Sequence, residues 1–364
     1  MLGSVIRMNT YEAKEIRCLI AGGAGFLGTN LARRLLEQGI SVDCVDNFST
    51  GRKTNVADLA RYPNFRFTKL DIADSGSCNR LLRRRYSHIY NLACPTGVPN
   101  IALLGEEMLM TSSLGSLNLL KVARRSNARY LFASTAEAYG DPEIFPQPET
   151  YVGKVDPVGP RSPYEEGKRF GEALTCFWGR KYDLDVRIVR IFNTYGPGMS
   201  PEDQRVIPQM FSHLIAQQPV PIYGDGAQTR TFLHVDDLVD GLLTVMERGV
   251  SAEVYNIGGA DQITICELFE LVRAVTGLSG SAVFEKHFTA DHHGRWPDTV
   301  KIQALGWRQR ISLADGVRRS YRDFLAATEA CHIGVNDASL DRLAFAGHRQ
   351  SLAADRHRTR PVSP

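Results

Sequence analysis

Two short stretches of the sequence hold side chains that could carry out acid–base chemistry. In the first, Ser-Thr-Ala-Glu-Ala-Tyr-Gly (134–140), Thr135 and Glu137 directly follow an apolar run at 129–134. In an open α/β sheet, ligands bind at the carboxyl ends of the strands. We therefore expect a hydroxyl and a carboxylate to face a ligand here; the alternative is that Glu137 only begins a solvated loop.

The second stretch contains Tyr164 and Lys168, whose spacing of four places them on one face of a helix. Ser162 as N-cap, Pro163 in the first helical position and Glu165 in a capping box predict where this helix begins. Tyr164 then lies in the first turn, where the helix dipole and a neighbouring ammonium favour the phenolate. Such a tyrosine can remove a hydroxyl proton while hydride leaves the same carbon.

These side chains need a scaffold, and the first half of the chain supplies alternating strand and helix patterns. Helical periodicity covers 27–38 and 108–126. Alternation of this kind predicts a Rossmann-type doubly wound parallel sheet with helices on both faces. The expected strands are 17–21, 41–45, 65–70, 88–93, 129–134 and 186–192. The second half, with helices expected at 205–217, 235–248 and 265–276, predicts a smaller α/β domain.

A glycine-rich loop follows the first expected strand. Gly22, Gly25 and Gly28 are spaced as G-x-x-G-x-x-G and open an amphipathic helix. Glycines let the backbone approach a pyrophosphate, and the helix N-terminus offers free N–H groups to it. The next strand leads into Asp46, and an acidic residue there binds ribose hydroxyls and repels a 2′-phosphate. The pattern predicts NAD, although the nearby Arg52 leaves NADP open.

Several longer stretches carry a resemblance to a known family. They are AGGAGFLGTNLARRLL, VDNFSTGRKTNV, NLACP, STAEAYGDPE, GPRSPYEEGKRFGEAL, RIVRIFNTYGPGM, GDGAQTRTFLHVDDLVDGL and RWPD…ALGW. Over approximately residues 15–325 the chain resembles the extended short-chain dehydrogenase/reductase family, and more narrowly its UDP-glucuronate decarboxylases (UDP-xylose synthases). The resemblance implies tightly held NAD, a UDP-sugar substrate, and a homodimer built from the helices at 108–126 and 163–181.

The resemblance also implies a domain division. Residues 1–15 form an N-terminal extension, and 16–193 form the NAD-binding domain, with a returning segment at about 232–262. Residues 194–231 and 263–327 are expected to form the substrate-binding domain. From residue 328 the chain is rich in Arg, His, Ala and Ser with little periodicity, which predicts a frayed helix and a disordered tail at 328–364.

Three sets of site residues follow from the same resemblance. The catalytic residues are Thr135, Glu137, Tyr164, Lys168 and Arg295. The cofactor-binding residues are Gly22, Gly25, Phe26, Leu27, Gly28, Asp46, Asn47, Ser49, Thr50, Gly51, Asp71, Ile72, Leu92, Cys94, Thr111, Tyr164 and Lys168. The substrate-binding residues are Asn193, Arg205, Tyr223, Arg230 and Arg295.

The implied reaction begins when Tyr164, aided by Lys168 and Thr135, takes the proton of the sugar C4 hydroxyl while NAD accepts the C4 hydride. The resulting ketone makes the C6 carboxylate a β-keto acid, which loses CO2 into an enolate. C5 is then protonated and hydride returns to C4. Glu137 would orient water or shuttle the C5 proton and disfavour the bound carboxylate, and Arg295 would anchor the carboxylate or the enolate.

Two departures from the family pattern bear on the product. Ala136 replaces a serine of the family, which predicts that some UDP-4-keto-xylose escapes. Ser112 stands where asparagine is usual and affects selectivity near the nicotinamide. His292 and His293 are adjacent, but no carboxylate at ligand spacing accompanies them, so no metal site is expected.

Three rival functions share much of this pattern. A UDP-sugar 4-epimerase, including one that acts on UDP-glucuronate, would use the same loop and tyrosine, but Glu137 would hinder its holding of the C6 carboxylate. A hexose 4,6-dehydratase would need an Asp-Glu pair at 136–137, and Ala136 removes half of it. A catalytically inactive NAD-binding scaffold is disfavoured by the intact Thr135, Tyr164 and Lys168.

Composition narrows the class of protein. The 364 residues are 43% hydrophobic with a net charge of +3, which is ordinary for a globular enzyme and gives no sign of nucleic-acid or membrane binding. No apolar run is long enough to span a membrane, and the N-terminus lacks a signal-peptide pattern. Seven scattered cysteines without a C-x-x-C pair favour the cytoplasm.

Overall fold

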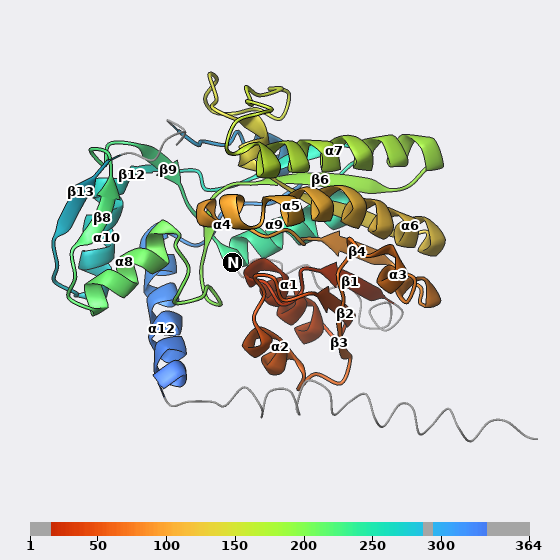
Figure 1. Ribbon diagram of the computed structural model, residues 1–364, viewed down its shortest axis with the longest axis horizontal. Helices are drawn as coiled ribbons and strands as arrows, with labels where there is room; N and C mark the ends of the chain where they lie inside the picture. Colours follow the sequence, from red (N-terminus) through yellow and green to blue (C-terminus); the bar gives the residue numbers. More distant parts are fainter. Residues whose placement is uncertain (1–15, 287–293, 333–364) are drawn as a thin grey trace, which may run out of the picture.

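The computed structural model describes residues 16–286 and 294–332. Within them, seven parallel strands form one sheet in the order β11-β6-β5-β4-β1-β2-β3 (Figure 1). The strands are β1 (Arg17–Ala21), β2 (Ser41–Asp46), β3 (Phe65–Lys69), β4 (His88–Asn91), β5 (Arg129–Thr135), β6 (Val186–Ile191) and β11 (Val254–Ile257). The predicted doubly wound sheet is confirmed, and the ends of the six expected strands shift by at most two residues.

Helices bury both faces of this sheet. Successive residues of β1 show why, because Leu19 and Ile20 point to opposite faces and both are fully buried in separate core clusters. Helices α1 (Phe26–Glu37) and α9 (Val235–Arg248) cover one face. On the other lie α6 (Ser116–Ser126) and α7 (Ser162–Tyr182), as Figure 1 shows. Shorter helices α2 (Lys53–Leu59), α3 (Ser75–Cys78), α4 (Val98–Leu103) and α5 (Gly105–Met110) lie in the connections.

The segment expected to be one helix at 108–126 is helical over its whole length. It consists of the end of α5, a π-helical turn at Thr111–Gly115, and α6. The predicted helix at 108–126 is confirmed as a continuous helical segment with one local widening, which periodicity does not reveal because the residues on both sides of it keep helical dihedral angles. Such turns are frequent at functional sites, and Thr111 and Ser112 in this one are buried.

A smaller domain packs around its own core, to the left in Figure 1. It pairs β8 (Val220–Tyr223) with β13 (Ala282–Glu285), and β9 (Thr229–Thr231) with β12 (Gln262–Thr264). Its helices are α8 (Val206–Ile215), α10 (Ile265–Thr276) and α12 (Leu313–His332). Side chains from all three helices share one cluster, which includes Phe211, Leu268 and Phe324. Two short strands, β7 (Thr194–Tyr195) and β10 (Leu233–His234), pair at the junction, and α11 (Val300–Ala304) precedes α12.

The shared core supports the predicted second domain, whose boundaries stay predictions. Helix α12 continues to His332, so the tail expected from residue 328 begins inside a helix. The N-terminal extension and residues 333–364 lie outside the described residues. No helix in the described part of the chain is long and apolar enough to cross a membrane.

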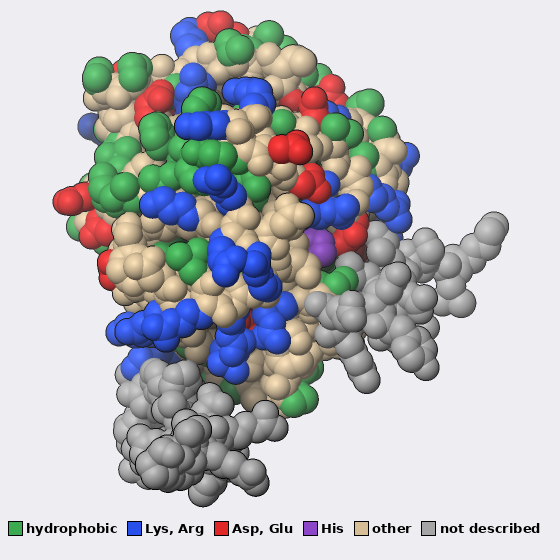
Figure 2. Space-filling model, turned by 90° about the vertical axis from the view of Figure 1, so that its right-hand side faces the viewer, with side chains coloured by type: hydrophobic (Ala, Val, Ile, Leu, Met, Phe, Trp, Pro, Cys, Tyr) green, Lys and Arg blue, Asp and Glu red, His purple; other side chains and the backbone are tan. Residues whose placement is uncertain are grey.

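The far end of the sheet, where α6 and α7 terminate, carries more basic than acidic side chains (Figure 2). Arg124 and Arg125 in the last turn of α6, and Arg180 and Lys181 near the end of α7, are exposed. Cations at helix C-termini complement the helix dipole. This basic face therefore stabilises the two helices at the end of the sheet opposite the carboxyl ends of the strands.

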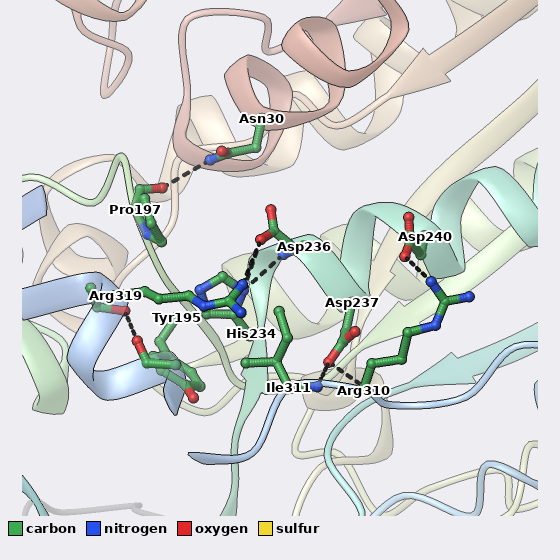
Figure 3. A network of polar contacts seen from close by, with 12 residues as sticks. Asn30, Tyr195, Pro197, His234, Asp236, Asp237, Asp240, Arg310, Ile311 and Arg319 are labelled. Atoms are coloured by element: carbon green, nitrogen blue, oxygen red, sulfur yellow. Dashed lines mark hydrogen bonds and ion pairs between the residues drawn. The ribbon is translucent and has the colours of Figure 1, made fainter. Parts of the chain in front are cut away.

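A network of polar contacts joins the two domains around the start of α9 (Figure 3). Asn30 of α1 donates from Nδ2 to the carbonyl of Pro197 at 3.0 Å. The buried Asp237 carboxylate accepts from the backbone N–H groups of Arg310 at 3.1 Å and Ile311 at 2.9 Å. Asp237 thus fixes the segment that leads into α12.

We expect Asp237→Ala to lower the free energy of unfolding by about 1–2 kcal/mol, because the part-buried N–H groups of Arg310 and Ile311 lose the buried carboxylate that accepts from them. Chemical denaturation measures the change. The matched control is Asp261→Ala, which removes an exposed carboxylate and should stay within about 0.5 kcal/mol of the parent. Equal stability of the two variants would contradict this role of Asp237.

Candidate active site

The glycine loop is shaped to admit a ligand at the start of α1. A Cβ on Gly28 would lie 2.1 Å from the Gly22 carbonyl oxygen, so α1 packs directly on the loop. Gly25, the N-cap of α1, differs: a Cβ there would meet only the Gly22 oxygen, at 3.3 Å. Apart from this one tight contact, no other neighbouring atom lies within 4 Å of that Cβ position, and this room together with the free N–H groups at the start of the helix fits the pyrophosphate of a dinucleotide. Phe26 and Leu27, also predicted to bind the cofactor, form the first residues of α1.

Asp46 lies at the end of β2, beside this loop. Its Oδ2 accepts from the Ala24 N–H at 3.0 Å and its Oδ1 from the Phe48 N–H at 2.8 Å. Burial raises the pKa of the carboxyl group, and the two N–H donors oppose the rise. A Cβ on Gly51 would lie 2.8 Å from Oδ1, which shows how closely the 47–51 loop wraps this carboxylate. The position suits a ribose hydroxyl.

The other predicted cofactor residues follow the carboxyl ends of neighbouring strands. Asn47 donates to Asp71 at 3.0 Å, which joins the ends of β2 and β3. Cys94, two residues beyond Leu92 in the loop after β4, places its sulfur 3.8 Å from the Ser112 hydroxyl. Ser49, Thr50, Ile72 and Thr111 occupy the same edge, in loops and the π-helical turn. The residues present therefore fit NAD, although each individual contact stays a prediction.

Helix α7 begins differently from the prediction. Arg161 is its N-cap, no side chain caps it, and Ser162 is the first helical residue. The expected capping box was wrong because the Glu165 carboxylate accepts from Arg161 Nε at 3.1 Å instead. Lys168 is buried and donates from Nζ to the Ala133 carbonyl at 2.8 Å, which fastens α7 to β5.

Tyr164 does not become acidic through its helix position alone. Burial raises its pKa, the charges of Cys94 and Glu137 raise it further, and a hydrogen bond with Thr135 together with the Arg205 charge lowers it. Burial also lowers the pKa of Lys168. Burial therefore opposes the predicted preference for the phenolate, and Thr135 and Arg205 favour it. The part that the Thr135 hydroxyl plays beside Tyr164 stays a prediction.

Thr135 and Glu137 occupy the carboxyl end of β5, as predicted. The Thr135 hydroxyl accepts from the Glu137 N–H at 3.2 Å and caps a short 3₁₀ turn, Ala136–Tyr139. The cap turns the chain sharply after the strand. Glu137 consequently leaves the sheet edge as part of an ordered turn, and the alternative of a merely solvated loop is disfavoured.

The Glu137 carboxylate meets two guanidinium groups. Its Oε2 accepts from Arg295 at 3.0 Å and from Arg161 at 2.5 Å. Arg295 is almost fully buried and also donates to the Gly140 carbonyl at 2.7 Å. The expected neighbourhood of Glu137 and Arg295 is present. Arg161 was missed: its place three residues before Tyr164 could have marked it as close to the site, but no spacing rule gives its partner.

The predicted substrate residues line the second domain and its junction with the first. Arg205 is the N-cap of α8, forms an ion pair with Asp203, and lies 5.5 Å above the Phe26 ring. Arg230 lies in β9, and Tyr223 ends β8. Asn193 follows β6, where its carbonyl accepts from the Leu233 N–H at 2.9 Å. Their contacts with a UDP-sugar stay predictions.

Neither histidine of the adjacent pair, His292 and His293, lies within the described residues. Among residues 16–286 and 294–332, no group of three or more histidine, cysteine, aspartate or glutamate side chains could hold a metal ion.

We expect Gly25→Ala to fold normally but to bind NAD about tenfold or more weakly, because its methyl group would fill the space beside the helix N-terminus. Calorimetric titration with NAD measures the affinity, and circular dichroism checks the fold. The control is Gly76→Ala, an exposed position in α3 away from the loop. Unchanged affinity in Gly25→Ala would place the pyrophosphate elsewhere.

Several enzymes of known structure that are named for nucleotide-sugar substrates share this fold. UDP-glucose 4-epimerase from Thermotoga maritima, with UDP-glucose, is 30% identical with a TM-score of 0.80, covering 86% of this chain and all of that one. DesIV, a dTDP-glucose 4,6-dehydratase from Streptomyces venezuelae with NAD bound, is 30% identical with a TM-score of 0.79, covering 86% and 98%. UDP-glucuronic acid 4-epimerase from Bacillus cereus, with UDP-glucuronic acid and NAD, is 25% identical with a TM-score of 0.78, covering 85% and 99%.

The relatives found by sequence comparison indicate a narrower group of enzymes than the fold does. UDP-glucuronic acid decarboxylase 1 of Arabidopsis thaliana is 40% identical over 312 residues, 85% of this chain and 70% of that protein. UDP-glucuronic acid decarboxylase 1 of Xenopus tropicalis is 38% identical over 314 residues, 86% and 73% of the two chains. Residues 18–258 also match the NAD dependent epimerase/dehydratase family. With the dinucleotide loop, the tyrosine–lysine helix and these relatives in agreement, the chain belongs to the NAD dependent epimerase/dehydratase family, within which it groups with the UDP-glucuronic acid decarboxylases.

Proposed function

We propose that this protein is an NAD-dependent UDP-glucuronate decarboxylase that forms UDP-xylose through a 4-keto intermediate. The observation that carries the proposal is the Glu137 carboxylate at the end of β5, held by the buried Arg295 beside Thr135 and Tyr164. The names of the relatives, at 38–40% identity, support the same substrate and reaction.

In the first step, Tyr164 takes the proton from the sugar C4 hydroxyl and Thr135 steadies the shared proton. The glycine loop and Asp46 would hold NAD, which would supply the acceptor for the C4 hydride and the hydride that is returned. Lys168, fixed by the Ala133 carbonyl, keeps this part of α7 against β5. Taking the C4 hydroxyl proton requires the phenolate of Tyr164, which burial opposes and which Thr135 and Arg205 favour by lowering the pKa of Tyr164. The phenol formed in this step is then the group that returns the proton to the C4 oxygen at the end.

The second step, the loss of CO2, involves Arg295 and Glu137. Once C4 is a ketone, loss of CO2 leaves electrons that enter an enolate, and a fixed cation stabilises that charge best in a desolvated place. Arg295 meets both conditions, because it is almost fully buried and held by the Gly140 carbonyl and Glu137. Glu137 would then orient the group that delivers a proton to C5.

Residue 136 argues against dehydration. A dehydratase must move protons while it expels the C6 hydroxyl, and it does so with an acid–base pair. Ala136 is buried and has no group that can transfer a proton. The absent hydroxyl also loosens the hold on the ketone, and some UDP-4-keto-xylose would leave before hydride returns.

Incubation of the purified protein with UDP-glucuronate should release CO2 and form UDP-xylose without added NAD, as mass spectrometry and CO2 detection would show. Tyr164→Phe should lower the rate by about 10²–10⁴-fold, because proton transfer at C4 is lost. Tyr62→Phe, which removes an exposed hydroxyl far from the site, is the matched control.

Each alternative product has a distinct signature in this experiment. An isomer of equal mass would indicate the 4-epimerase and overturn decarboxylation. Equimolar UDP-4-keto-xylose and NADH would indicate that the ketone is released in place of UDP-xylose. No turnover of UDP-glucuronate at all would overturn the proposed substrate.

We also propose that two copies of the chain associate through α5, the π-helical turn and α7. Helices α5 and α7 pack against each other and leave large apolar side chains exposed. Phe170 and Phe177 lie seven residues apart on one side of α7, at 53% and 51% exposure, and Leu109 and Leu114 lie on the neighbouring elements. A stripe of this kind marks an interface, and a twofold axis would pair it with itself. A cytoplasmic location stays a prediction of the cysteine pattern.

Phe177→Glu should convert the dimer to a monomer, because it places a charge in the apolar stripe. Light scattering coupled to size-exclusion chromatography measures the mass. The control is Phe284→Glu on β13, which is equally exposed but belongs to the second domain. If Phe177→Glu remains dimeric, the interface lies elsewhere.

A further inference from the structure

Arg161 occupies an unusual place for an N-cap residue. It begins α7, yet its side chain satisfies no backbone group of the helix. Instead it reaches two carboxylates, donating from Nε to Glu165 at 3.1 Å and from a terminal nitrogen to Glu137 at 2.5 Å. The side chain is mostly buried, at 15% exposure. A guanidinium is suited to this, because its donors diverge in a rigid plane and can serve two acceptors at once.

The second carboxylate belongs to the reaction centre. Glu137 Oε2 receives one donor from Arg161 at the start of α7 and another from Arg295, which lies 158 residues away from Glu137 in the sequence. Glu165 contributes a second negative charge, and its side chain is 4% exposed. Two guanidinium groups and two carboxylates thus form a mostly buried cluster whose formal charges cancel. Neutral pairing is what allows such groups to remain charged away from water.

We propose that Arg161 is a positioning residue that keeps Glu137 ionised and directed toward Arg295, and that ties the tyrosine helix to the end of β5. This assignment rests on the proposed decarboxylase function, in which Glu137 assists protonation at C5. Tyr164 lies three residues after Arg161, and Thr135 two residues before Glu137. One side chain therefore links the half of the site that oxidises C4 to the half that loses CO2.

The ionisation of Glu137 depends on a small set of described neighbours. Arg161 at the N-cap of α7 and Arg295 in the 294–297 segment form ion pairs with Glu137, and Tyr164 lies close enough to feel its charge. Glu165 is the second carboxylate bound by Arg161. Around Tyr164, the further charged or titratable groups are Cys94 and Arg205. Removing the Arg161 cation takes one guanidinium away from Glu137 and leaves the Glu165 charge without the guanidinium that the two carboxylates share. Both changes favour protonation of Glu137 at a higher pH.

Three variants separate a positioning role of Arg161 from a general structural role. They are Arg161→Met, Arg161→Lys and the control Arg180→Met. For Arg161→Met we expect kcat for UDP-glucuronate decarboxylation to fall by about 100-fold, with a smaller change in KM. The acid limb of its kcat–pH profile should move to higher pH, and the fraction of product released as ketone with NADH should rise. Arg180 is exposed near the far end of α7, and its variant should match the parent.

Arg161→Lys keeps the charge but loses the fork, so it serves one carboxylate at a time. It should recover part of kcat, with the acid limb near that of the parent. If Arg161→Met fails to fold, Arg161→Lys still tests the proposal, because a kcat and a ketone fraction equal to those of the parent in Arg161→Lys would overturn it. A parental pH profile in folded Arg161→Met would overturn it as well. Failure of the unaltered protein to release CO2 would instead overturn the proposed function, and this assignment with it.

Discussion

The close contact between α7 and β5 is the constraint on which the site depends. Gly171 allows it, because a Cβ there would lie 2.3 Å from the Phe132 ring. Lys168 then reaches the Ala133 carbonyl, and Glu172 accepts from the Ser134 hydroxyl at 2.5 Å. These contacts fix α7 along β5, the strand that ends at Thr135. The tyrosine hydroxyl therefore meets Thr135 through packing of helix on strand, and no flexible loop has to bring them together.

Burial shifts the pKa values of the side chains in the site and makes their charged forms costly in free energy. Desolvation raises the pKa of Tyr164 and lowers that of Lys168, so each charged form needs a partner. In the cluster around Glu137, the positive charges of two arginines and the negative charges of two glutamates offset one another, and this pairing compensates for the loss of water. A fixed arrangement of this kind needs little reorganisation when charge develops on a substrate, which is the condition for strong electrostatic stabilisation.

The sequence predicts the scaffold well because the scaffold follows from local chemistry. Strands buried on both faces appear as apolar runs, and a glycine loop between a strand and a helix has few other uses. Arg161 and the π-helical turn escape such rules. The capping-box pattern at Ser162 was present, but the pairing of Arg161 with Glu165 prevailed over it. Contacts between residues as distant as Glu137 and Arg295 come from the folded arrangement, and only the family resemblance anticipated them.

The fold by itself does not distinguish decarboxylase from epimerase, because solved epimerases and a dehydratase share it. The difference has to lie in how firmly the sugar is held after C4 is oxidised. An epimerase must let the ketone turn over before hydride returns, whereas a decarboxylase must keep C6 against the groups that receive the developing charge. Here three separate segments meet at the Glu137 carboxylate: the end of β5, the start of α7 and the 294–297 segment. These contacts hold the Glu137 carboxylate in one place, and under the proposed function that carboxylate faces C6 of the sugar. Ala136, between Thr135 and Glu137, adds no polar group to this hold.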